Sequence, residues 1–274
     1  MNRFKLALAI TLCLSPLSWS PLSATAQVVG SQVSTTRRQV KFIQQPSSVD
    51  LSRRGAPDSG RRVSGGSRGC VGGNKLTALV PLTKNSQGKE YVFGTTAAEY
   101  PTFWFYIGYE LATEMRITFV LTDDQSHEIY QATALISKNT TPGIFSLRPT
   151  EVPLKVGKMY QWYFYVDCHP TDSSEPFSFV NGWVERVSLE ETPYSDGVPP
   201  LTGTGIEQAV VYGREGVWYD ALTIVGEQLQ ANPQDARIQA EWTGLLLDIG
   251  LEAIPLEPLE ALKLEKEDLQ PIAY

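Results

Sequence analysis

The segment Pro101–Tyr109 contains five aromatic residues, four of them consecutive, and no charged side chain. A run of this length is too short to span a membrane, and its residues favour a strand over a helix. We therefore interpret it as a central strand that is buried on both faces. Pro101 occupies the first position of this strand, where a missing N–H group does least harm.

Other segments have the alternating pattern of half-buried strands. Met115–Leu121 and His127–Ile136 flank a polar turn, which predicts a hairpin, and Lys158–Asp167 alternates in the same way. The remaining predicted strands are Leu76–Val80, Gly143–Leu147 and Ser178–Val187. These strands predict a mainly β fold, α+β overall, in which residues 70–190 form an antiparallel β-sandwich that is Ig-like in size.

Residues 191–274 are predicted to contain a linker followed by a C-terminal helical segment. Apolar residues recur here at helical spacing, and Asn232-Pro233 ends one predicted helix and starts the next. Gly250 is a suitable C-cap for the second helix. The sequence thus predicts an α-helical hairpin, and the tail is predicted to add one short helix, Glu257–Glu267.

Residues 1–26 have the pattern of a signal peptide. Arg3 and Lys5 precede the apolar run Leu6–Leu14, and Ala24-Thr-Ala26 forms a small-x-small cleavage site. No later apolar run is long enough to span a bilayer. We therefore expect an exported mature chain, periplasmic or extracellular, without a transmembrane helix.

Residues 27–69 are rich in Gly, Ser and Arg and contain eight basic and two acidic residues, whereas residues 70–274 contain 13 basic and 28 acidic residues. The first stretch has no hydrophobic periodicity, so it cannot bury enough apolar area to offset its ordering entropy. We predict a disordered basic linker. Alternatively, this arm could bind the acidic body or an anionic surface such as a membrane or a wall polymer.

Two cysteines follow the predicted cleavage site, Cys70 and Cys168. In an oxidising compartment such a pair predicts one disulfide, which would tie the start of the β domain to its centre. The alternative is a free Cys168 thiol beside Asp167 and His169. Adjacent residues of a strand point to opposite faces, so this Cys–His pair does not have the arrangement of a catalytic dyad.

Several motifs occur in an order that resembles one protein family. They are Leu76-Thr-Ala-Leu-Val-Pro81, Pro101-Thr-Phe-Trp-Phe-Tyr106, Pro142-Gly-Ile144, Tyr160-Gln-Trp-Tyr163 with Cys168, Gly182-Trp-Val-Glu-Arg186, Gly216-Val-Trp-Tyr-Asp-Ala-Leu222 and Trp242 with Leu245-Leu246. Over residues 70 to 260 the chain is similar to the exported cyanobacterial family catalogued as domain of unknown function 928. This resemblance implies a fold and a compartment, and it implies no activity and no catalytic residues.

The helical segment has a second, more limited resemblance. Gly216, Ala221 and Pro233 have the spacing of the small and proline positions in a tetratricopeptide repeat, but no second copy with a matching pattern is present. The segment is therefore either an ordinary helical hairpin packed on the sandwich or a groove that binds a partner. For the second alternative, the candidate partner-binding residues are Trp218, Tyr219 and Trp242.

The sequence contains no recognisable catalytic, metal or cofactor site. The two histidines have no partner at ligand spacing, and no nucleophile elbow, phosphate loop or His-Glu-x-x-His motif is present. Aromatic residues on the predicted strands are expected to fill the core, although an exposed set would form a platform for sugars. These residues are Trp104, Tyr106, Trp162, Tyr163, Tyr165 and Trp183.

These observations favour an exported, non-catalytic protein that binds another envelope macromolecule, either a protein or a glycan. We expect no nucleic-acid partner and no cofactor. One alternative is a glycan-binding module that uses the aromatic strand residues. Another is a hydrolase of envelope polymers, which would require a cleft with converging carboxylates or a free Cys168 thiol.

Overall fold

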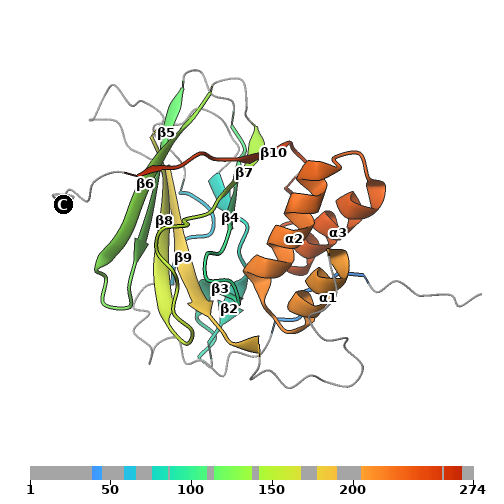
Figure 1. Cartoon of the computed structure of the whole chain (residues 1–274), viewed down its shortest axis with the longest axis horizontal. Helices are drawn as coiled ribbons and strands as arrows, with labels where there is room; N and C mark the ends of the chain where they lie inside the picture. Colours follow the sequence, from blue (N-terminus) through green and yellow to red (C-terminus); the bar gives the residue numbers. More distant parts are fainter. Residues whose placement is uncertain are drawn as a thin grey trace, which may run out of the picture. The chain divides into compact units, whose positions relative to one another are not determined.

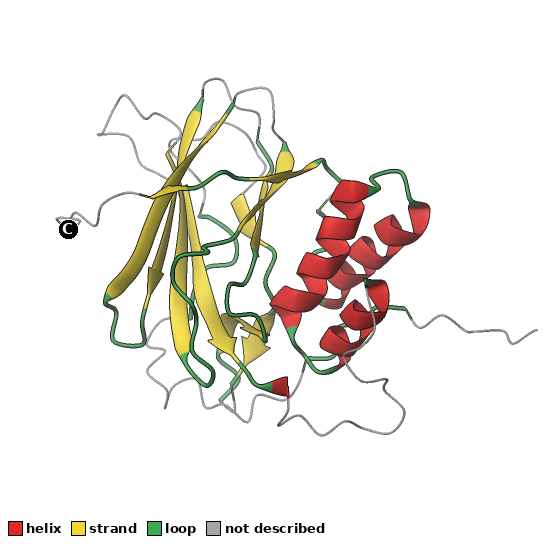
Figure 2. Ribbon diagram, in the orientation of Figure 1, coloured by secondary structure: helices red, strands yellow, loops and turns green. Residues whose placement is uncertain are grey.

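The computed structural model describes residues 39–44, 59–65, 76–85, 87–109, 114–137, 142–167, 178–189, 205–254 and 256–266. These residues all belong to one compact unit, Arg38–Tyr274. They form two mixed β-sheets and three α-helices (Figure 2). Within this unit the smaller sheet lies between the larger sheet and the helices (Figure 1).

The smaller sheet has the strand order β1-β4-β7-β10. Its strands are β1 (Leu76–Ala78), β4 (Phe103–Ile107), β7 (Gly143–Leu147) and β10 (Leu259–Ala261). β4 pairs antiparallel with β1 and β7, and all five of its residues are buried. The prediction of an aromatic strand buried on both faces is therefore confirmed, although the strand begins at Phe103 and not at Pro101.

The larger sheet has the strand order β11-β6-β5-β8-β9-β3-β2. Its strands are β2 (Leu82–Lys84), β3 (Glu90–Thr96), β5 (Met115–Thr122), β6 (Glu128–Ile136), β8 (Met159–Asp167), β9 (Ser178–Arg186) and β11 (Glu265–Lys266). The predicted β5–β6 hairpin is confirmed, with Ile117 opposite Ala134. β2 and β3 were not predicted.

Neither sheet is wholly antiparallel, in contrast to the prediction for residues 70–190. β3 pairs in parallel with β9, and β10 pairs in parallel with β7. Parallel neighbours need a long connection, and both pairs join segments that are far apart in the chain. The β10 strand comes from the tail after the helices, so it could not be placed by considering residues 70–190 alone.

Aromatic rings join the two sheets. Phe105 of β4 stacks on Phe164 of β8 with ring centroids 3.9 Å apart, and Phe103 of β4 lies 5.0 Å from Phe119 of β5. Phe119 and Phe164 belong to the faces that the alternating sequence pattern predicts to be buried, and both are fully buried. The pattern of period two therefore correctly identified the inner face of the larger sheet.

The helices pack on the opposite face of β4. They are α1 (Ile206–Arg214), α2 (Trp218–Ala231) and α3 (Ala236–Asp248). Trp104 of β4 points toward them, and its ring lies 5.4 Å from that of Trp242 on α3. One large hydrophobic cluster contains residues from both sheets and from the three helices, so the helices do not form a core of their own.

The predicted helical hairpin corresponds to α2 and α3, and α1 precedes it as a third helix. The short helix predicted at Glu257–Glu267 is wrong, because this stretch forms β10 and β11. Backbone hydrogen bonds hold β10 against β7: Ile144 N donates to Pro258 O (3.0 Å) and Leu262 N donates to Ser146 O (2.7 Å). The available sheet edge therefore overrides the local helix propensity.

Two parts of the predicted disordered linker are packed in the fold. In residues 39–44, the side chains of Val40 and Phe42 are buried. In residues 59–65, Arg61 pairs with Asn181 of β9 and Val63 pairs with Thr77 of β1. The prediction of disorder is wrong for these two segments, because each pairs with a distant part of the chain. Local sequence carries no sign of such contacts.

Candidate functional site

A polar pocket of about 260 Å³ lies between α1, α2 and the chain that runs from β3 to β4. Arg148, which directly follows β7, adds a basic group to its wall. The other polar groups used below are Thr96, Thr102, Gln208, Asp220 and Glu227. The pocket therefore lies where the helical segment meets both sheets.

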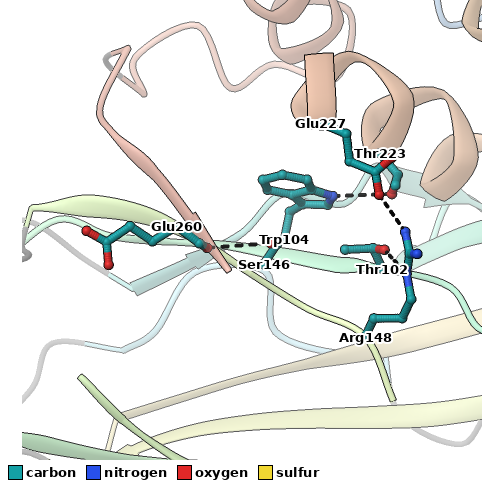
Figure 3. Close-up of polar contacts among 7 residues, drawn as sticks. All are labelled: Thr102, Trp104, Ser146, Arg148, Thr223, Glu227 and Glu260. Carbon is teal, nitrogen blue, oxygen red and sulfur yellow. Dashed lines mark hydrogen bonds and ion pairs between the residues drawn. The ribbon is translucent and has the colours of Figure 1, made fainter. Parts of the chain in front are cut away.

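Arg148 connects the smaller sheet to α2 at this pocket (Figure 3). Its Nε donates to Thr102 Oγ1 and its Nη2 donates to Glu227 Oε1, each at 2.7 Å. The Arg148 and Glu227 side chains are 44% and 54% exposed, so their ion pair contributes only about 0–1 kcal/mol to stability. The contacts fix the direction of the guanidinium more than they stabilise the fold.

Asp220 lies in the first turn of α2, where a carboxylate is favoured by the helix dipole. Its Oδ2 accepts hydrogen bonds from Thr96 Oγ1 (2.7 Å) and from Ala97 N (3.0 Å). Burial raises the pKa of Asp220 above its ordinary value, and these hydrogen bonds oppose the shift only in part. Asp220 therefore ties the end of β3 to α2 and adds a carboxyl with a raised pKa to the pocket wall.

The inner wall of the pocket includes Tyr219, whose ring is fully buried. Its hydroxyl accepts a hydrogen bond from Trp162 Nε1 at 2.9 Å and donates to Trp183 O at 3.5 Å. Burial raises the pKa of this hydroxyl well above its ordinary value, so Tyr219 stays un-ionised near neutral pH and serves only as a hydrogen-bond partner. Next to it, Trp104 Nε1 donates to Thr223 Oγ1 at 3.3 Å (Figure 3).

The residues predicted to bind a partner, Trp218, Tyr219 and Trp242, are at most 1% exposed. Trp218 Nε1 donates to Leu79 O at 2.8 Å, and the Trp242 ring packs against Trp104. Trp218 and Trp242 fill the core between the helices and the sheets, so a macromolecule cannot contact them; helical spacing does not distinguish the core face of a helix from an exposed apolar face. Tyr219 is also buried, but its side chain lines the inner wall of the pocket.

The aromatic strand residues also lie mainly in the interior. Trp104, Trp162 and Trp183 are at most 2% exposed and Tyr106 is buried, so the prediction that they fill the core is confirmed. They cannot form a platform for sugars. Tyr163 and Tyr165 are only partly buried, and their parallel rings have centroids 6.0 Å apart. The four buried residues, Trp104, Tyr106, Trp162 and Trp183, therefore cannot form the sugar platform that the glycan-binding alternative requires.

Cys70, Cys168 and His169 lie outside the described residues, so the disulfide stays a prediction. His127 Nδ1 lies 3.1 Å from Asp123 Oδ2 in the exposed β5–β6 turn. Asp123 Oδ1 also accepts the backbone N–H groups of Gln125 and His127. In the part of the chain that the structure describes, no group of three or more His, Cys, Asp or Glu residues could hold a metal ion.

Apart from Tyr219, the pocket residues were not singled out from the sequence. Asp220 and Glu227 are seven residues apart on α2, and this spacing places both on one side of a helix. The spacing alone is common, and Thr96 at the end of β3 and Arg148 just after β7 are far away in the chain. Only the packing of α2 against both sheets brings these four residues together.

The fold and the pocket define a mainly β protein with three helices packed on the smaller sheet. The chain belongs to the family described as Domain of Unknown Function (DUF928), whose family model matches residues 63–259. This range extends from the segment paired with β1 to the start of β10 and includes the whole pocket. Comparison with curated proteins and with solved structures gave no match. Among the described residues, no helix is both long and apolar enough to cross a bilayer.

The raised pKa of Asp220 predicts a pH dependence of stability. A carboxyl whose folded-state pKa is raised contributes stability below its unfolded pKa of about 3.9 and loses it as the pH rises through the folded value. We therefore expect the stability of the wild type, relative to Asp220→Asn, to fall as the pH rises from about 4. Urea unfolding of both proteins at a series of pH values measures this. Thr96→Ser keeps the hydroxyl donor and should retain the wild-type profile, whereas a constant difference between wild type and Asp220→Asn would contradict the prediction.

Proposed function

We propose that the protein is an exported, non-catalytic binding protein, and that its pocket binds a neutral saccharide unit of an envelope polymer. Export is proposed from the signal-peptide pattern of residues 1–26. As the scaffold we propose a β-sandwich that is Ig-like in size, supported by the ring contacts between β4 and the larger sheet. The observation that carries the binding proposal is the mixed set of donors and acceptors around the pocket.

Saccharide hydroxyl groups both donate and accept hydrogen bonds, so a site for them needs both kinds of partner. The Arg148 guanidinium supplies donors, Asp220 and Glu227 supply acceptors, and the Gln208 amide supplies both. Tyr100 and Tyr212 add aromatic rings to the wall. The volume of about 260 Å³ is below that of sites for drug-sized ligands, which start at roughly 300 Å³, so it suits a single sugar unit.

The charges around the pocket favour a neutral ligand over an anionic one. Among the described residues that line the pocket, Arg148 is the one basic residue, and it already forms an ion pair with Glu227. Asp220 adds a second carboxyl, so no uncompensated positive charge remains to attract an acid. A neutral hydroxylated unit can instead use these groups as hydrogen-bond partners without a cost from like charges.

The positions of the carboxyls support binding over hydrolysis. A glycosidase needs two carboxyls that flank the bond to be broken and are available to donate a proton or to attack. Here Glu227 is held by Arg148, and Asp220 Oδ2 already accepts two hydrogen bonds.

Calorimetric titration with neutral and acidic oligosaccharides tests this proposal. We expect neutral hexasaccharides, such as those of β-1,4-glucose or β-1,4-N-acetylglucosamine, to bind better than oligogalacturonate. Because a hydrogen bond to a charged group contributes about 1.5–3 kcal/mol, Arg148→Met should weaken binding by about 10- to 100-fold. Arg116→Met, on exposed β5 surface, is the matched control and should leave binding unchanged. Absence of binding to every neutral oligosaccharide, or cleavage of any of them, would refute the proposal.

A further inference from the structure

Residues 39–44 pack as a separate short segment against α1 and α3. Within this segment Val40 and Phe42 are buried, whereas Gln39, Lys41 and Ile43 are exposed. The Phe42 ring meets Trp218 edge-on, with centroids 4.9 Å apart and an interplanar angle of 75°. The segment thus contributes two apolar side chains, at alternate positions, to the core beneath the helices.

The helices hold this segment by its backbone. Val40 N donates to Glu241 Oε2 at 2.8 Å, and Phe42 N donates to Asp248 Oδ2 at 2.7 Å. Ile43 N donates to the Gly213 carbonyl of α1 at 2.9 Å. These three bonds recognise main-chain N–H groups, so they do not depend on which side chains the segment carries.

Gly213 allows the segment to approach α1 closely. A Cβ atom at this position would lie 3.2 Å from Lys41 C and only 2.7 Å from Lys41 O, and the second distance is shorter than Cβ atoms tolerate. The neighbouring backbone of the segment would have to move away. Gly213, Glu241 and Asp248 therefore define a groove that fits an extended backbone with an apolar-x-apolar pattern, and we refer to these residues with α1 and α3 as the segment groove.

We propose that the segment groove is an interaction surface for a second copy of this chain, which inserts its own residues 39–44 in place of the resident segment. A second copy carries the identical segment, so an exchange reproduces every contact described above. Exchange of an identical element is a low-cost route to a dimer. Lys41 of the segment also complements in charge the Glu241 and Asp248 carboxylates of α3, which accept the neighbouring backbone N–H groups.

The chain length permits this exchange. Gln44 is followed by residues 45–58 before the next described segment begins at Ser59. Fourteen residues can span up to about 46 Å when extended. The dimer has the same contacts as the monomer and costs only association entropy, so its population rises with protein concentration.

Mixing two variants of the mature chain tests the proposal. Phe42→Asp weakens the segment and leaves the groove intact, whereas Gly213→Val blocks the groove and leaves the segment intact. Each variant alone is expected to be monomeric. An equimolar mixture is expected to form a 1:1 complex in analytical ultracentrifugation, because the intact segment can enter the intact groove. Failure to form a complex at concentrations up to the millimolar range would overturn the proposal.

A labelled peptide of residues 37–46 provides a second measurement on the full chain. Its affinity for Phe42→Asp is expected to exceed its affinity for the wild type by at least tenfold, because the resident segment no longer competes. Val40→Ser replaces Phe42→Asp if circular dichroism shows that the latter does not fold. The peptide with aspartate in place of Phe42 is the control and should not bind. Equal affinity of the peptide for wild type and variant would also count against exchange.

Discussion

Replacing Trp218 with alanine is expected to lower the free energy of unfolding by about 3–5 kcal/mol. The Trp218 side chain is fully buried at the start of α2. It contacts Phe42, and its Nε1 donates to Leu79 O beside β1. Its removal would leave a cavity where the helices, the smaller sheet and the N-terminal segment meet, and it would also leave a buried carbonyl without its partner.

Urea or guanidinium unfolding followed by circular dichroism measures this loss. Trp218→Phe is the matched variant, because it keeps a ring that can contact Phe42 and removes the N–H donor. It should be less stable than the wild type and clearly more stable than Trp218→Ala. If Trp218→Ala were within about 0.5 kcal/mol of the wild type, as surface substitutions usually are, helices and sheets would not share one core.

Gly182→Ala is expected to have the second largest effect, at the upper end of the 1–3 kcal/mol that overpacking typically costs. Gly182 lies in β9 opposite Trp162 of β8. A Cβ atom there would lie 2.5 Å from Trp162 Cζ2 and 2.8 Å from Val92 O of the adjacent β3 strand. Trp162 is fully buried and the carbonyl belongs to the sheet backbone, so neither neighbour can move aside at low cost.

Comparing the thermal unfolding of Gly182→Ala with that of Gly65→Ala isolates the effect of steric crowding around the added Cβ atom. At Gly65 the nearest atom to an added Cβ is 3.9 Å away, so alanine should change stability by no more than about 0.5 kcal/mol. Both substitutions reduce the entropy of the unfolded chain to the same extent. Equal melting temperatures for the two variants would contradict the close packing of β9 between β8 and β3.

Local patterns in the sequence located most of the strands. Alternation identified β5 and β8 and their buried faces, and the aromatic run identified β4, because these strands bury whole faces whatever their neighbours are. β2 is only three residues long, and Gly94 interrupts the apolar pattern of the β3 sequence, so neither strand was recognised. β10 contains no alternation of its own and is a strand because the edge of β7 is available to it.

The candidate site was less accessible to sequence reasoning than the fold. Trp218 and Trp242 attract notice in a sequence, yet their size is the reason that they are buried in the core. Arg148 and Asp220 are ordinary polar residues, and their significance lies in contacts to Thr102 and Thr96 across the boundary between helices and sheets. Such contacts have no local signature.

The bonds from Val40 and Phe42 to α3 join residues 201 and 206 positions apart in the chain. A chain synthesised from its N-terminus therefore cannot finish its core until the third helix has emerged, and β10 follows later still. Folding dominated by such remote pairs is slow, because loop-closure entropy is lost before the contacts form. An early stop codon anywhere before α3 would thus leave the tryptophans of the nascent protein uncovered, as targets for chaperones and proteases.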